Sequence, residues 1–372
     1  MTLYRYMTHS PPKLEYFREL FNEIREVKQH IKKLSIPEPI KTSRIVYGRD
    51  SDFIPRSIVD YIEKTILITY KWRFIIGKNR RREYNINIGL RGEDSDIAEH
   101  YVKMIYSWLL VADKYAKCDC SKKMDIYIYM TDLKKKLPEN SGQTIGVENV
   151  NTAFTTSCKD DTEIHLFREE EWFKVLIHET FHNFGLDFSA FNKTKSQELM
   201  SRIFCIKTSF LLYESYTETL AEIIAIIFDK TPKWNNFRAQ VIKEQKFSIM
   251  QCCKILNYMG LTYKSLSCND MGSGAVLLRK KYREDSAVFS YYVIKSILLF
   301  YIDEFTEWCD IYNENTLRFA DGSKTQNAIV AFCDFIKKHH MGVEFLKEID
   351  YTEQQLCKKI IPRNYASLRM QS

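Results

Sequence analysis

Two histidines four residues apart, in the stretch His178-Glu179-Thr180-Phe181-His182, are the residues of this sequence best suited to chemistry. Residues at this spacing lie one turn apart on one face of an α-helix, so both imidazoles can reach a single metal ion. Glu179 would then lie beside the ion without binding it, which suits a general base acting on water. The motif predicts a zinc site, with one ion per chain.

The residues around the motif predict the helix that must carry it. The apolar run Val175-Leu176-Ile177 leads into His178, and Gly185 follows His182 by three residues. An apolar run indicates a buried helix, and glycine is typical of the position just after a helix ends. We therefore expect a buried helix that stops at Gly185.

A catalytic zinc ion needs a third protein ligand and an open position for water. Three glutamates, Glu214, Glu218 and Glu222, follow at intervals of four and therefore share one helical face. A solvated acidic stripe would normally alternate with lysine or arginine, and none occurs between residues 210 and 229. Carboxylates on an apolar helix need a cation, which the histidine pair would supply as zinc. Glu218, Glu214 and Asp187 are the candidates for the third ligand.

The motif and the piece Thr217-Glu218-Thr219-Leu220-Ala221-Glu222 together resemble the gluzincin group of zincin metallopeptidases. The resemblance implies that Glu218 binds zinc with His178 and His182. It also implies that Glu222 accepts the distal N–H of one histidine and fixes its tautomer. The metzincin group is disfavoured, because Phe188 stands where its third ligand would be, although Gly185 matches its pattern.

The order of the expected elements also resembles the N-terminal half of zincins. The fold class we expect is α+β, with an N-terminal mixed sheet, the active-site helix and a mostly helical C-terminal subdomain. The expected domains are an N-terminal arm and linker (1–45), a sheet subdomain with the motif (46–188) and a helical subdomain with the third ligand (189–372). Hydrophobic periodicity predicts the following elements: helices over 13–33, 94–115, 132–137, 196–229, 237–258, 285–313, 327–339 and 352–361, strands over 66–76, 84–90, 124–130 and 163–167, and an extended stretch over 145–156.

Within that extended stretch, residues 149–155 occupy the place of the zincin edge strand. Unpaired backbone groups on such a strand can hydrogen-bond an extended peptide. An edge covered by the protein's own loops is the alternative.

The C-terminal half should supply a donor for the oxyanion that forms during hydrolysis. Tyr291 and Tyr292 are the first candidates, and further ones are Tyr282, Arg283, His339 and His340. Tyrosines at helical spacing are more often core residues, and His165 is expected to be structural.

Composition limits the other functions. The formal net charge of +7 is modest for 372 residues, and the basic run Lys78 to Arg82 reads as a hairpin tip, so nucleic-acid binding is not expected. Ten cysteines show no paired C-x-x-C pattern, and the sequence has neither a secretory signal nor a membrane-spanning stretch. We expect free thiols and a cytoplasmic location. Abundant Lys, Ile, Asn, Tyr and Phe are typical of AT-rich genomes, including those of large DNA viruses, so virus association is a further expectation.

These observations predict a zinc metallopeptidase that hydrolyses peptide bonds in a peptide or protein substrate. The alternative is a catalytically silent zincin-fold protein with a structural or peptide-binding role. The intact Glu179 favours the enzyme, because a silent relative does not need the base.

Overall fold

A mixed six-stranded sheet forms one half of the protein, in a computed structural model that describes residues 12–77, 81–140, 142–228, 233–268, 276–277, 279–358 and 365–372. Its parallel pairs are β3 with β4 and β4 with β7, and the other neighbours are antiparallel. In spatial order the strands are β1 (Ile40–Thr42), β2 (Ile68–Ile76), β3 (Arg82–Leu90), β4 (Lys123–Tyr129), β7 (Asp161–Leu166) and β6 (Ala153–Thr155).

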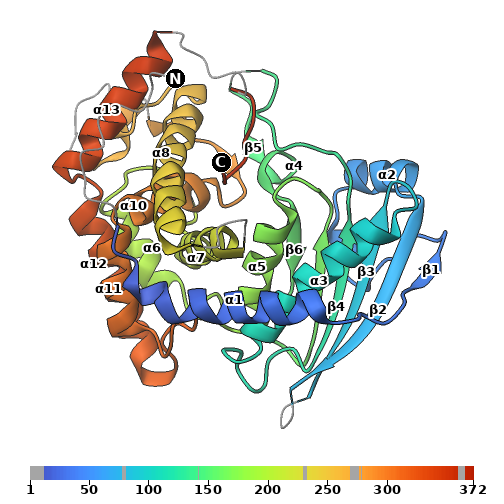
Figure 1. Ribbon diagram of the computed structural model, residues 1–372. Helices are drawn as coiled ribbons and strands as arrows, with labels where there is room; N and C mark the ends of the chain where they lie inside the picture. Colours follow the sequence, from blue (N-terminus) through green and yellow to red (C-terminus); the bar gives the residue numbers. More distant parts are fainter. Residues whose placement is uncertain are drawn as a thin grey trace.

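The sheet is buried on both faces, as alternation along β4 shows. Met124, Ile126 and Ile128 enter the main core, whereas Tyr127 and Tyr129 enter a smaller core on the opposite face. The smaller core is completed by α2 (Arg56–Thr65), which the periodicity did not predict. On the main-core side lie α3 (Ser95–Ala112) and α5 (Trp172–Asn183) (Figure 1).

Among the described residues after Asn183, the regular elements are helices, apart from β8 (Glu284–Asp285), which pairs with β5 (Ile145–Gly146) of the first half. Across the bottom of Figure 1 runs α1 (Arg18–Lys33), which contacts α3 and the helical half through α7. The helices of this half are α6 (Thr194–Ser201), α7 (Leu212–Phe228), α8 (Trp234–Tyr258), a π-helical segment (Phe289–Ile294), α10 (Lys295–Phe300), α11 (Ile302–Tyr312), α12 (Thr325–His339) and α13 (Val343–Cys357).

Residues 365–372 lie between the two halves, near the centre of the molecule (Figure 1). The backbone N–H of Met370 donates to Glu171 Oε1 of the sheet half at 2.8 Å. Its carbonyl accepts from Lys295 Nζ of the helical half at 2.7 Å. This segment therefore links the two halves through buried charged side chains.

Several predicted elements are confirmed. The hairpin of β2 and β3 forms in antiparallel register, although its tip at residues 78–80 lies outside the described ranges. The α3 helix starts as expected, with the Asp94 side chain accepting from the N–H of Ile97 at 2.9 Å. The mixed sheet and the helical second half agree with the α+β expectation at this coarse level.

Other predicted elements are wrong. Residues 132–137 form no helix, because Lys135 N donates to Glu170 and Leu137 N donates to Ala366 O, which holds this stretch extended. The expected extended stretch contains one helical turn, α4 (Val147–Val150), so the edge strand is only β6. The predicted helix 196–229 is interrupted between α6 and α7, and that over 285–313 begins with the π-helical segment.

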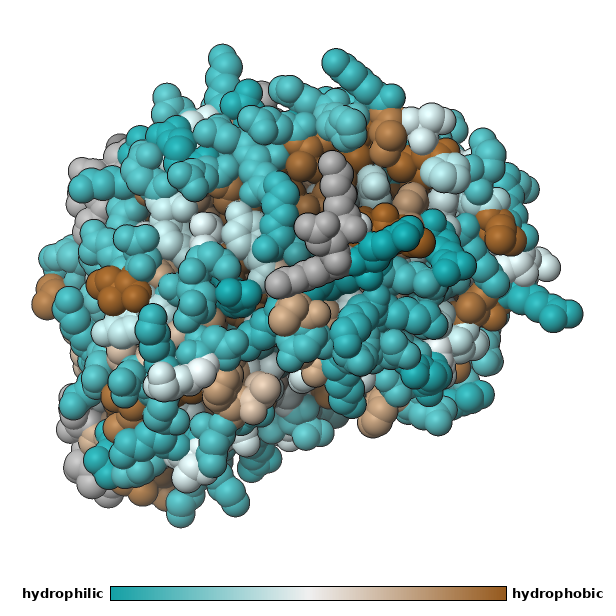
Figure 2. Space-filling model, turned by 90° about the horizontal axis from the view of Figure 1, so that it is seen from below, coloured by the Kyte–Doolittle hydropathy of each residue, from teal (hydrophilic) through white to brown (hydrophobic). Residues whose placement is uncertain are grey.

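The expectation that all ten cysteines are free is also wrong. Cys120 pairs with Cys158, and Cys205 pairs with Cys268. Disulfides persist mainly in oxidising surroundings, so these two bonds do not support the expected cytoplasmic location, which is not confirmed. In the described part of the chain, no helix combines the length and apolar character needed to cross a membrane. Most of the face in Figure 2 is hydrophilic, with hydrophobic side chains in smaller groups.

Candidate metal centre

The motif lies on α5, a helix in which every residue is buried. It is buried because it lies between the sheet and α7, so its polar side chains must find partners inside the protein. It ends as predicted: Gly185 has φ +63°, Leu186 N donates to Phe181 O, and Gly185 N donates to His182 O. A Cβ on Gly185 would lie 2.9 Å from Cys120 Sγ, so glycine is required both by the turn and by the space.

Three ligand atoms converge beside this helix. His178 Nε2 lies 3.1 Å from His182 Nε2, and Glu214 Oε2 lies 3.0 Å from the first nitrogen and 3.7 Å from the second. Tetrahedral zinc with ligand bonds of about 2.0–2.1 Å would separate its ligand atoms by roughly 3.3 Å. The donor set of two imidazoles and one carboxylate, at this spacing, therefore fits a zinc ion.

The distal nitrogens of both histidines are held by carboxylates. His178 Nδ1 donates to Glu218 Oε2 at 2.9 Å, and His182 Nδ1 donates to Asp187 Oδ2 at 2.5 Å. Asp187 is itself fixed by the N–H and hydroxyl of Ser189. A carboxylate at Nδ1 keeps the proton there and leaves the lone pair of Nε2 for a metal.

The positions of the three glutamates differ from those that the gluzincin resemblance implies. Glu214, rather than Glu218, faces the Nε2 atoms, and Glu218, rather than Glu222, contacts a distal nitrogen. Glu222 makes an ion pair with Lys295 at 2.5 Å. The contacts in the structure are therefore shifted by one helical turn, toward the start of α7, from those that the resemblance implies.

Buried lysines supply the cations that the acidic stripe needs. Lys174 pairs with Glu218, and Lys295 pairs with Glu222. Within the described ranges, Glu214 has neither a lysine nor an arginine as partner, and its ionic contacts are the two histidines. Of the three glutamates, Glu214 is thus the one that remains available to a metal ion.

The electrostatics of the cluster agree with this arrangement. Burial opposes charge on His178, but hydrogen bonds to Glu214 and Glu218 raise its pKa to about 9. Burial likewise opposes charge on His182, and Asp187 and Glu214 outweigh it and raise that pKa. The pKa of Glu214 is lowered despite burial, because both histidines attract its charge. The site therefore favours positive charge at the point where the three ligand atoms meet.

Glu179 is buried next to the cluster, and within the described chain no hydrogen bond restrains its carboxylate. Burial raises its pKa, although His178 and His182 act in the opposite direction. A carboxylate with a raised pKa, free of structural partners, is suited to accept a proton and release it again.

Only one of the two predicted tyrosines faces the site. The Tyr291 hydroxyl donates to Glu214 Oε2 at 3.1 Å, whereas that of Tyr292 donates to Leu368 O at 2.6 Å, away from the histidines. Both lie in the π-helical segment, and such segments occur often at functional sites. Burial and the charge of Glu214 raise the pKa of Tyr291, which keeps the phenol protonated as a donor.

The remaining candidates lie elsewhere. Tyr282 donates to Glu284, and the His339 ring packs on Tyr301. His165 lies between two aromatic rings and hydrogen-bonds Glu163, in keeping with the expected structural role.

Sequence reasoning missed four residues around the centre: Lys174, Asp187 as a partner of His182, Tyr213 and Lys295. Tyr213 packs its ring 5.8 Å from that of His182. One signal was available, since Lys174 is a charged residue inside an apolar run, four residues before His178.

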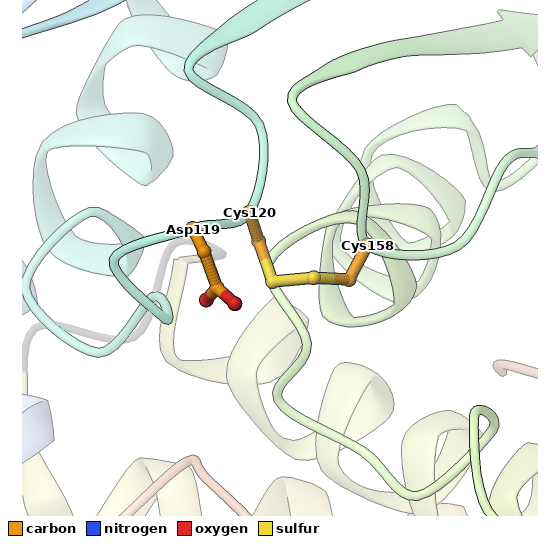
Figure 3. A group of neighbouring side chains, drawn as sticks. All are labelled: Asp119, Cys120 and Cys158. Carbon is orange, nitrogen blue, oxygen red and sulfur yellow. A yellow bond between two sulfur atoms is a disulfide. The ribbon is translucent and has the colours of Figure 1, made fainter.

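A disulfide lies at the end of α5 (Figure 3). It joins residues 117–121 to Cys158, and both segments donate to backbone carbonyls at the end of α5 or just after it. Cys158 N donates to His182 O, Ser121 Oγ to Asn183 O, and Lys117 N to Phe184 O. The Cys120–Cys158 bond therefore keeps together the groups that cap the helix beside a candidate ligand.

Asp119, Cys120 and Cys158 also place three potential ligand atoms near one another. Figure 3 shows the two sulfurs bonded to each other, and a disulfide offers no thiolate to a metal. In the described part of the chain, the cluster of His178, His182 and Glu214 is therefore the better metal site.

Comparison of the chain with protein-family models, with curated proteins and with solved structures finds no match in any of the three.

Proposed function

We propose that the protein is a zinc-dependent metallopeptidase whose ligands are His178, His182 and Glu214. The observation that carries the proposal is the meeting of two Nε2 atoms and a carboxylate oxygen at zinc-ligand spacing, beside the unrestrained Glu179. Zinc in such a site lowers the pKa of a water molecule toward neutrality and polarises a carbonyl group.

The residues around the ligands divide the remaining work. Glu179 accepts the proton of the attacking water and passes it to the leaving amine. The Tyr291 hydroxyl, which donates to Glu214 in this structure, is placed to donate to the oxyanion of the substrate. Glu218 and Asp187 hold the histidines in the orientation and tautomer that the site needs.

The edge strand gives an argument for a peptide substrate. The register of β6 with β7 turns the backbone groups of Ala153 and Thr155 away from the sheet, at its last strand. Asn183, the last residue of α5, donates to Thr155 Oγ1 at 2.7 Å and to Thr156 O at 2.5 Å. An extended peptide paired with β6 would thus run along the metal helix.

The first test is the zinc content of the purified protein by elemental analysis. We expect about one zinc per chain in the wild type and a loss in His182→Ala and Glu214→Gln, because each removes a ligand. Glu218→Gln should still bind zinc when zinc is in excess, because Glu218 contacts Nδ1 of His178 and not the Nε2 atom that would bind the metal. Zinc retained by Glu214→Gln and lost by Glu218→Gln would restore Glu218 as the ligand.

The second test separates the peptidase from a catalytically silent protein. Glu179→Gln should keep one zinc per chain and lose cleavage of a fluorogenic peptide library, because the amide cannot accept the proton. A wild type that binds zinc but cleaves no peptide, like the variant, would favour the silent alternative.

A further inference from the structure

The buried face of α7 pairs two of its three glutamates with lysines, and only one of these lysines is connected to a candidate ligand. Lys174 Nζ donates to Glu218 Oε1, while Glu218 Oε2 accepts from His178 Nδ1. One turn further along α7, the Lys295–Glu222 pair has no contact with either histidine among the described residues. The two pairs are alike in chemistry but differ in their connection to the site.

We propose that Lys174 is a positioning residue for the metal centre, acting through Glu218 on His178. The inference rests on the proposed zinc site. Lys174 occupies one carboxylate oxygen of Glu218, so the other oxygen is turned to His178 Nδ1. The imidazole is thereby held with Nε2 directed toward His182 and Glu214.

The geometry of α5 makes this connection possible. Lys174 precedes His178 by four residues, so both side chains leave the same face of the helix, one turn apart. Glu218 of α7 reaches across to both of them, and α5 and α7 are in contact. The lysine and the candidate ligand are therefore fixed to the same carboxylate by the same rigid helix.

In the described chain Glu218 is the carboxylate that Lys174 hydrogen-bonds, although the charge of Glu171 also acts on the lysine. Its side chain is 1% exposed, and that of Glu218 is 2% exposed, so neither charge can turn to solvent. The other contact of the ammonium group is Met370 Sδ at 3.8 Å, a weak acceptor. A buried carboxylate that loses its cation is strongly disfavoured, and it is free to turn away from the imidazole.

A purely structural role would make Lys174 and Lys295 equivalent. Lys295 and Glu222 are 1% and 0% exposed, so this pair is equally buried and lies on the same helix. Lys174→Met and Lys295→Met are therefore matched variants. Both remove a buried ion pair, and Lys295→Met also loses the hydrogen bond to Met370 O, but only Lys174→Met leaves the partner of His178 without its anchor.

The experiment measures the dissociation constant for Zn²⁺ in full-length, metal-stripped protein, by competition with a chromogenic chelator. We expect Lys174→Met to weaken zinc binding by about 10- to 100-fold, the usual effect of losing an outer partner of a ligand. We expect Lys295→Met to stay within about 3-fold of the wild type. The absorption spectrum of bound Co²⁺ should change in Lys174→Met and not in Lys295→Met, since it reports ligand geometry.

The double variant Lys174→Met/Glu218→Gln keeps the inference testable if Lys174→Met fails to fold, because it leaves no buried carboxylate unpaired. If Lys174 acts through Glu218, the double variant binds zinc as tightly as Glu218→Gln alone. If the double variant binds zinc more weakly than Glu218→Gln, the inference is overturned. Equal zinc affinities of Lys174→Met and the wild type would overturn it too. A wild type that binds no zinc would overturn the proposed function and this inference together. A wild type that binds zinc no more tightly than Lys174→Met would overturn this inference alone.

Discussion

At the scale of single residues, Glu214 is our candidate ligand because it is the glutamate that lacks another cation. Glu214, Glu218 and Glu222 are equivalent in type and spacing, but Lys174 and Lys295 neutralise the last two. The two lysines come from α5 and α10, so their positions depend on how these helices pack against α7. This packing leaves Glu214 to the histidines.

Tyr291 and Tyr292 give a residue-scale prediction. Tyr291→Phe should lower kcat for peptide cleavage by about 10²- to 10³-fold, the usual effect of losing an oxyanion donor, with zinc retained. Tyr292→Phe loses its bond to Leu368 O, so it should lower the free energy of unfolding by about 1 kcal/mol and leave kcat unchanged. Steady-state kinetics and denaturant unfolding measure the two effects. Equal kcat values for both variants would remove Tyr291 from the mechanism.

At the scale of elements, the site depends on the end of α5. The predicted glycine turn is present, two segments donate to the last carbonyls there, and a third accepts from the Asn183 side chain. Two of these segments are joined by the Cys120–Cys158 disulfide, and Asn183 ties the third, β6, to the same helix end. The cap, the candidate ligand His182 and the edge strand therefore form one connected unit.

The two disulfides give an element-scale prediction. Their loops span 38 and 63 residues, and by chain entropy each bond stabilises the fold by about 4 kcal/mol. The double variants Cys120→Ser/Cys158→Ser and Cys205→Ser/Cys268→Ser should therefore lose similar stability in denaturant unfolding. Only the first should also weaken zinc binding, because that bond adjoins the end of α5, which carries His178 and His182. Equal zinc affinities in both variants would show that the cap does not need its disulfide.

At the scale of the whole molecule, the centre joins the two halves. His178 and His182 belong to the helix that packs on the sheet, whereas Glu214 and Tyr291 come from the helical half. Residues 365–372 cross the same boundary behind the site. A metal bound here would therefore oppose separation of the halves as well as take part in chemistry.

This position predicts a change in thermal stability. A ligand that binds only the folded state at about 1,000 times its Kd adds roughly 4 kcal/mol to the free energy of unfolding. Removing zinc with a chelator should therefore lower the Tm of the wild type by several degrees in scanning calorimetry. His182→Ala, which lacks a ligand, should show no such shift. A wild type with one zinc per chain and an unchanged Tm would place its metal elsewhere.

Short-range patterns in the sequence were sufficient for much of the fold. The helix of the motif, its end at Gly185, the β2–β3 hairpin and the capped start of α3 follow from periodicity and from residues near in sequence. These features depend on backbone geometry and local hydrogen bonds, which neighbouring residues control. The wrong helix at 132–137 is the opposite case, since its backbone bonds to Glu170 and Ala366.

Local sequence patterns were enough to place two histidines and a glutamate on one buried helix and three acids on one face of another. Which acid faces the histidines depends on tertiary packing, because residues four apart on a helix point the same way and differ only in their position along the axis. The packing of α5 against α7 sets that position, and buried lysines from α5 and α10 complete the choice. The pairing of Cys120 with Cys158 was decided in the same way, by contacts between segments that the chain brings together only when it folds.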